Sequence, residues 1–190
     1  MNEKRYFIAV PLPDEAKRAL FQFCDRRKMS FPFRRWVYEE DYHITLKYLG
    51  ACAPTTLEQV KERLKVAVSG RDSFPISVAG WGYFGRSESP RILWAGVGGD
   101  LTALHSLQGK VESLMSEIGF EKENRPYRPH VTLAKHFEEG QFSGTTMDAH
   151  WKQEFRNMSW GVSSIVLYRT DLHRIPMYVK EGEYLLCHDG

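Results

Sequence analysis

The sequence YHITL at residues 42–46 is matched almost half a chain later by PHVTL at residues 129–133. In both stretches His and Thr stand two positions apart and are followed by Leu. Alternate side chains of a β-strand point to the same face, so His43 and Thr45 are predicted to share one face. The same alternation pairs the histidine and the threonine of the second stretch. Each copy is therefore predicted to be an amphipathic strand that presents one imidazole and one hydroxyl.

Two imidazoles and two hydroxyls form a set suited to displacement at phosphorus. An imidazole titrates near ~6.5, so one histidine can accept a proton from the attacking group while the other donates one to the leaving oxygen. Thr45 and Thr132 can donate hydrogen bonds to phosphate oxygens, where negative charge must be held. His43 and His130 are thus the candidate catalytic pair. One neutral and one charged histidine predict a bell-shaped pH dependence with limbs on either side of neutrality.

The weight of this pattern comes from its repetition. A single H-x-T would carry little information, because short motifs recur by chance. Two copies in matching strand-like contexts, both continued by Leu, are much harder to explain as ordinary half-buried strands. The residues alone do not say which histidine donates and which accepts.

The composition excludes several classes of protein. Hydrophobic residues make up 42% of the 190 residues and aromatic residues 13%, which excludes intrinsic disorder. A net charge of only +2 requires any contact with RNA to come from a local basic site. The three cysteines are scattered and form no C-x-x-C pair, and no apolar stretch approaches the ~18 residues of a membrane span. We therefore expect a cytoplasmic protein without metal, cofactor, membrane association or obligate protein partner.

The order of predicted elements indicates an α+β fold. Helical spacing of apolar residues predicts three helices, over residues 13–24, 55–68 and 101–118. Strand-like segments lie between and after them, at 6–10, 36–38, 42–49, 74–84, 91–98, 130–136, 160–169 and 177–186. Short spacings between several strands favour antiparallel pairing. No linker-like stretch divides the chain, so residues 1–190 are expected to form a single domain.

Together with their surroundings, the motifs resemble the RNA 2',3'-cyclic phosphodiesterase family, also called 2'-5' RNA ligase-like, of the two-histidine (2H) phosphoesterase superfamily. The resemblance implies two pseudo-symmetric lobes, each an antiparallel sheet backed by helices, around a central cleft. It implies metal-independent hydrolysis of RNA 2',3'-cyclic phosphate ends to 2'-phosphates, with 2'-5' joining of tRNA halves in vitro for some members. By position, His43 would be the proton donor and His130 the proton acceptor. The matching stretches are YFIAVPLP at 6–13, Trp36 leading into YHITLKYLG at 42–50, RILWAGV at 91–97, and RPYRPHVTLAK at 125–135.

Further side chains are candidates for holding the substrate. Strand parity places Lys47 on the face of His43 and Arg128 on the face of His130, where a cation would help to hold a phosphodiester. Arg125 is a possible contact for RNA backbone. A terminal base could stack on an aromatic ring, although each candidate ring could instead pack in the core. These rings are Phe84, Trp36, Tyr38 and Tyr168.

Two other functions stay open at this point. The substrate could be another small cyclic phosphate, such as a cyclic nucleotide or an ADP-ribose cyclic phosphate, or a 2'-5' linked oligonucleotide. Alternatively, the protein could be a module that binds RNA ends or tRNA fragments without turnover. The intact His and Thr of both motifs count against such a module, because a binder needs no matched pair of proton-transfer groups.

Overall fold

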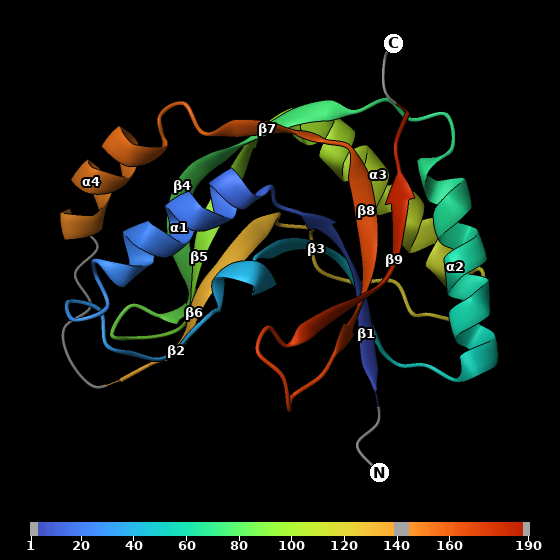
Figure 1. Cartoon of the computed structure of the whole chain (residues 1–190), viewed down its shortest axis with the longest axis horizontal. Helices are drawn as coiled ribbons and strands as arrows, with labels where there is room; N and C mark the ends of the chain where they lie inside the picture. Colours follow the sequence, from blue (N-terminus) through green and yellow to red (C-terminus); the bar gives the residue numbers. More distant parts are fainter. Residues whose placement is uncertain (1–3, 139–144, 188–190) are drawn as a thin grey trace.

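A nine-stranded antiparallel sheet forms the centre of the part that the computed structural model describes, residues 4–138 and 145–187 (Figure 1). Its strands are β1 (Arg5–Pro11), β2 (Phe33–Trp36), β3 (His43–Ala51), β4 (Phe74–Arg86), β5 (Ser89–Gly99), β6 (His130–Phe137), β7 (Ser159–Val162), β8 (Ser164–Thr170) and β9 (Tyr178–Leu185). The helices in these ranges are α1 (Asp14–Asp25), α2 (Pro54–Val68), α3 (Leu101–Ser116), α4 (Thr145–Phe155) and the 3-10 turn η1 (Glu39–Asp41). The α+β class predicted from the sequence is confirmed.

The sheet has two halves that meet at the strands carrying the two motifs. Its strand order is β7-β4-β5-β6-β3-β1-β8-β9, with β2 paired to β6. β3 and β6 pair only where Ile44 faces Val131, whereas β1 pairs with β3 along its whole length and β5 pairs with β6 from Ile92 to Gly96. The two sheets implied by the resemblance are therefore joined at a narrow seam. The motif strands lie side by side on that seam.

Helices back each half of the sheet. α1 and α4 lie over the half that contains β4, β5 and β6, and α2 and α3 pack together beside β1, β8 and β9 (Figure 1). α3 begins where the sequence predicts, because the Asp100 carboxylate caps it by accepting the N–H of Ala103 at 2.9 Å. None of the helices within the described ranges has the length and apolar content needed to cross a bilayer.

Two features of the last third differ from the sequence prediction. α4 was not expected, because its sequence gives a weak periodic signal, although Trp151 and Phe155 are buried. The segment 160–169, expected to be one strand, is two. β7 pairs with β4 and β8 pairs with β1, so the chain crosses between the halves of the sheet at Ser163. The apolar pattern of the sequence continues through Ser163, so the change of partner strand could not be predicted from it.

Both motif strands contain a β-bulge directly after the threonine. In β3, Ala9 pairs with Thr45 and Ile8 pairs with Lys47, so Leu46 has no partner of its own. In β6, the equivalent shift passes over the leucine at position 133, which follows the motif threonine. A bulge inserts one residue and reverses the alternation of side chains beyond it. Strand parity therefore holds from His to Thr in each motif and fails after Leu.

Candidate active site

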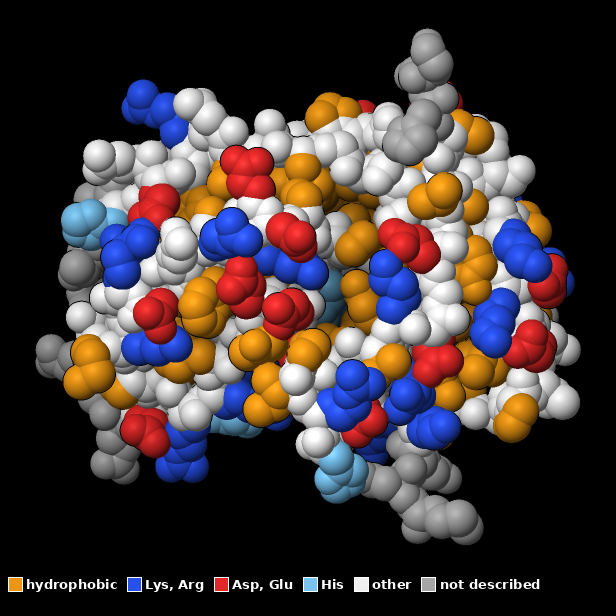
Figure 2. All heavy atoms as spheres, in the orientation of Figure 1, with side chains coloured by type: hydrophobic (Ala, Val, Ile, Leu, Met, Phe, Trp, Pro, Cys, Tyr) orange, Lys and Arg blue, Asp and Glu red, His pale blue; other side chains and the backbone are white. Residues whose placement is uncertain are grey.

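The two motifs present their polar side chains at the seam of the sheet. His43, Thr45, His130 and Thr132 are all partly exposed, whereas the apolar residues between and directly after them are buried. The predicted sharing of a face within each motif is thus observed. A cavity of about 720 Å³ adjoins the seam and includes Thr45 and His130 in its lining. Figure 2 shows a hollow near the middle of one face, with a histidine visible inside it and charged side chains around it.

Both imidazoles are oriented in the same way. The Nδ1–H of His43 donates to the carbonyl of Asp41 at 2.8 Å, and the Nδ1–H of His130 donates to the carbonyl of Arg128 at 2.7 Å. A carbonyl only accepts hydrogen bonds, so each Nδ1 carries a proton and each Nε2 is left to exchange one. The Nε2 of His43 lies 3.0 Å from the hydroxyl of Thr45. The backbone two residues before each histidine thus fixes which nitrogen does chemistry.

Burial lowers the pKa of both imidazoles in the free protein. Burial lowers the pKa of His43 to about 4, opposed by its bond to the Asp41 carbonyl and reinforced by the charges of His130 and Lys135. Burial also lowers the pKa of His130, opposed by its bond to the Arg128 carbonyl. A proton on His130 disfavours one on His43, so the pair favours states with at most one proton. An anionic phosphate placed between them would raise the pKa of both.

Aromatic rings surround each histidine. The ring of Phe7 lies 4.7 Å from that of His43, and Tyr178 meets the same imidazole edge-on at 5.1 Å. Tyr168 lies 6.2 Å from His43 and stacks on Phe7 at 5.3 Å. These rings exclude water from one side of the imidazole and account for its lowered pKa.

The second histidine has its own aromatic neighbours. Phe84 meets His130 edge-on at 5.1 Å, and Trp94 lies 6.2 Å from it. The structure thus brings two of the predicted rings, Phe84 and Tyr168, beside the histidines. Trp36 instead packs edge-on against Phe33 at 5.8 Å and lies, partly buried, against the core. Tyr38 is exposed and lies just before η1.

Lys47, which strand parity places on the face of His43 and Thr45, is among the residues that line the cavity, but its ammonium has partners on the side of α3. The bulge at Leu46 turns Lys47 toward α3, where its side chain is 3% exposed. Its Nζ forms an ion pair with Glu112 at 2.6 Å and donates to the carbonyl of Glu121. A strict period of two cannot anticipate this, because the bulge depends on pairing with β1.

Because of the bulges, two side chains that the sequence did not indicate become exposed near the motifs. In β6 the reversal of alternation gives Lys135 the partly exposed place that strict parity assigns to Ala134, and the charge of Lys135 acts on His43. Burial, together with the charge of Arg35, lowers the pKa of Lys135 itself. In β3 the corresponding position is Tyr48, which lines the cavity and is 52% exposed. The one available signal was the shared Leu after each motif, which marks the bulge in both copies.

Asp41 is a second residue without a sequence signal. It is buried, and its carboxylate accepts the backbone N–H groups of Met177 and Tyr178 at 3.1 and 3.0 Å. Its carbonyl holds His43, so this one residue connects the β8–β9 turn to the motif. In the sequence Asp41 is the last of three consecutive acidic residues, Glu39-Glu40-Asp41, and nothing distinguishes it from the other two.

Three arginines lie around the cavity on the side of His130. Arg91, Arg125 and Arg128 all line it and are exposed. Arg128 and Arg125 were expected near the substrate, whereas Arg91 was not singled out. For metal ions, the described residues contain no group of three or more His, Cys, Asp or Glu side chains arranged to hold one.

Comparison with known proteins places this site in a family. Residues 10–94 match the family model of LigT-like phosphoesterases. The RNA 2',3'-cyclic phosphodiesterase of Bacillus subtilis strain 168 is 31% identical over 91% of this chain and 91% of its own length. The protein of the same name from Geobacillus stearothermophilus is 37% identical over 94% of this chain, which spans only 56% of that relative.

Solved structures agree on the fold. The crystal structure of E. coli LigT complexed with 3'-AMP matches 97% of this chain and 99% of its own with a TM-score of 0.75 at 22% identity. A structure described as that of a phosphoesterase matches with a TM-score of 0.74 at 24% identity, over 97% of this chain and 99% of its own. The resemblance first seen in the two motifs thus extends over nearly the whole chain. The chain belongs to the LigT-like phosphoesterase family.

Proposed function

We propose that this protein hydrolyses 2',3'-cyclic phosphate ends of RNA to 2'-phosphomonoesters. The observation that carries the proposal is the matched pair of imidazoles at the β3–β6 seam. Each has its Nδ1–H bound to the carbonyl two residues earlier, so that both Nε2 atoms are left for proton transfer. The relatives named RNA 2',3'-cyclic phosphodiesterase support the substrate class.

In the proposed reaction His130 is the base and His43 is the acid, as the resemblance implies. The Nε2 of His130 takes a proton from water while the water oxygen forms a bond to phosphorus. The bond between phosphorus and the 3'-oxygen breaks, and the Nε2–H of His43 gives its proton to that oxygen. The phosphate stays on the 2'-oxygen, and the enzyme is left with the two protonation states exchanged.

The threonines hold the phosphate in this scheme. While His43 is neutral, its Nε2 accepts a hydrogen bond from Thr45, 3.0 Å away. Once His43 is protonated, its Nε2 can no longer accept from Thr45, so the hydroxyl hydrogen is free to turn toward a phosphate oxygen while the Nε2–H is available to the 3'-oxygen. Thr132 holds the corresponding place in the second motif. The Thr45 hydroxyl is therefore able to donate a hydrogen bond to the phosphate in the state in which His43 is protonated.

Around this centre we assign substrate contacts by position. Arg128 lines the cavity together with Phe84, so a guanidinium and a ring adjoin His130. Tyr168 takes the equivalent place beside His43. Trp36 is assigned no contact, since it packs against Phe33 and the core, and Lys47 acts through its buried ion pair with Glu112. The free thiols of Cys24, Cys52 and Cys187 support a cytoplasmic location.

The test is the identity of the product. Incubation with uridine 2',3'-cyclic phosphate and with a short RNA ending in a cyclic phosphate should yield the 2'-phosphate, resolved from the 3'-phosphate by chromatography. His43→Gln and His130→Gln, which keep a polar side chain, serve as inactive controls. Accumulation of the 3'-phosphate would contradict the direction of attack. Binding of the RNA without turnover would identify a binding module instead.

A further inference from the structure

One wall of the cavity is a loop that carries positive charge. Residues 117–129 connect α3 to β6, and two of the cavity arginines, Arg125 and Arg128, belong to this loop. The third, Arg91, faces the cavity from β5. Glu123 is also part of the lining, which leaves an excess of positive charge. The net charge of the whole chain is only +2, so this concentration is local.

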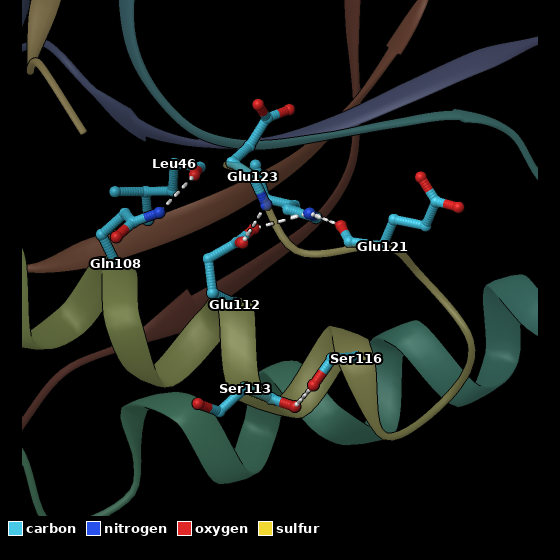
Figure 3. Close-up of polar contacts among 8 residues, drawn as sticks. Leu46, Gln108, Glu112, Ser113, Ser116, Glu121 and Glu123 are labelled. Carbon is cyan, nitrogen blue, oxygen red and sulfur yellow. Dashed lines mark hydrogen bonds and ion pairs between the residues drawn. The ribbon is translucent and has the colours of Figure 1, made fainter. Parts of the chain in front are cut away.

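The loop is tied down next to the first motif strand rather than left free. The Glu123 N–H donates to Glu112 of α3 at 2.9 Å, and the carbonyl of Glu121 accepts from Lys47 of β3. The hydroxyl of Tyr127 donates to the carbonyl of Thr45 at 3.0 Å. Figure 3 shows the Glu112 side chain reaching from α3 to the backbone of Glu123, with the backbone carbonyl of Glu121 nearby. The loop is therefore held at three points along its length.

The centre of this attachment is a buried ion pair. The side chains of Lys47 and Glu112 are 3% and 11% exposed, and their charged atoms are 2.6 Å apart. The Leu46 carbonyl, at the bulge that turns Lys47 toward α3, accepts from the amide of Gln108 at 3.5 Å. A buried pair costs desolvation and is a weak source of stability, so a role in fixing one conformation is its better-attested use. Here the fixed conformation is that of the arginine loop.

Resting on the function proposed above, we propose that this wall binds the RNA strand on the 5' side of the reacting nucleotide. Arginines place forked donors where successive phosphates pass, and each neutralised phosphate adds salt-dependent affinity. The exposed ring of Tyr48, also in the lining, offers a stacking surface for a base. The cavity, at about 720 Å³, lies in the upper part of the roughly 300–1,000 Å³ range of small-ligand sites. The enzyme should therefore prefer an oligonucleotide to a mononucleotide.

The experiment compares kcat/KM for a uridine dinucleotide ending in a 2',3'-cyclic phosphate with that for uridine 2',3'-cyclic phosphate. The wild-type protein should favour the dinucleotide. Arg91→Gln and Arg125→Gln should each lower this preference about 3- to 10-fold, and the two substitutions together should flatten the log–log salt dependence of dinucleotide turnover by about 0.7, the amount expected for its one additional phosphate. Arg18→Gln on α1 is the matched control, because it removes an equally exposed charge outside the cavity. It should leave the preference unchanged.

A second variant tests the attachment of the loop. The double substitution Lys47→Met/Glu112→Leu removes both buried charges, so that neither is left unpaired. It should keep the circular dichroism spectrum of the wild type and lower the preference for the dinucleotide. Equal kcat/KM for the two substrates in the wild-type protein, or a preference that survives both arginine variants, would overturn this inference and leave the proposed function standing. Failure to turn over either substrate would overturn both.

Discussion

The lowered pKa values of the two histidines predict that the free enzyme works best in acid. With a pKa of about 4, only about one His43 in 10³ carries a proton at pH 7, which corresponds to a cost of about 4 kcal/mol for loading the acid. His130 titrates below its usual range as well. Both limbs of the pH profile should therefore lie at lower pH than the positions on either side of neutrality that the sequence predicts. The singly protonated pair is most populated below pH 6.5.

The assay is the pH dependence of kcat/KM for uridine 2',3'-cyclic phosphate, which reports the free enzyme. Because a lowered pKa confines the proton to lower pH, we expect a maximum on the acid side of ~6.5. Above that pH the value should fall about tenfold for each unit. The profile of kcat should lie at higher pH, since the bound phosphate anion stabilises a neighbouring imidazolium.

A direct measurement separates this reasoning from kinetics. The ring-proton signals of His43 and His130 in an NMR titration, assigned by their loss in the His43→Gln and His130→Gln variants, should move at pH values below that of a model imidazole. Saturation of the enzyme with inorganic phosphate should shift both titrations upward. A kcat/KM maximum above neutrality, or a ring of His43 that titrates at the model value, would refute the argument from burial.

Three further predictions follow from the same geometry. His43→Ala and His130→Ala should each lower kcat by about 10²–10⁴, with thermal unfolding little changed; a rate within a few-fold of wild type in either variant would exclude the two-histidine mechanism. Excess chelator should leave turnover unchanged, because the imidazoles transfer the protons, and loss of activity restored by a divalent ion would point to a metal instead. Lys47→Met leaves the Glu112 carboxylate buried and unpaired, so it should cost about 3–5 kcal/mol and lower Tm by roughly 6–20 °C. Lys47→Met/Glu112→Leu should recover most of this loss in the same melting experiment, and no recovery would show that the charge left behind is not the cause.

Local regularities explain why much of this protein could be predicted from its sequence. The alternation of polar and apolar residues is set by backbone geometry within a few residues, so the sharing of a face by His43 and Thr45, and by the second pair, was predictable. Three of the α-helices in the described ranges were predictable for the same reason, and α3 by its cap at Asp100. α4 was not, because its apolar spacing is weak. The repeated motif also indicated the chemistry, since two imidazoles with two hydroxyls suit few reactions.

Contacts between distant segments decided the rest. Whether a strand bulges depends on its partner strands, so strict alternation could not show that Lys47 turns into an ion pair with Glu112 while Lys135 takes a partly exposed place in β6. The crossing at Ser163 likewise depends on partner strands, because β7 pairs with β4 before it and β8 pairs with β1 after it. The pKa values of the histidines depend on rings that come from β1, β4, β5, β8 and β9. The candidate reacting groups could be predicted from the sequence, because their identities and spacing are local. The affinity of each histidine for its proton, and the choice of cations that line the cavity, could not be predicted in this way, because burial and pairing are properties of the assembled sheet.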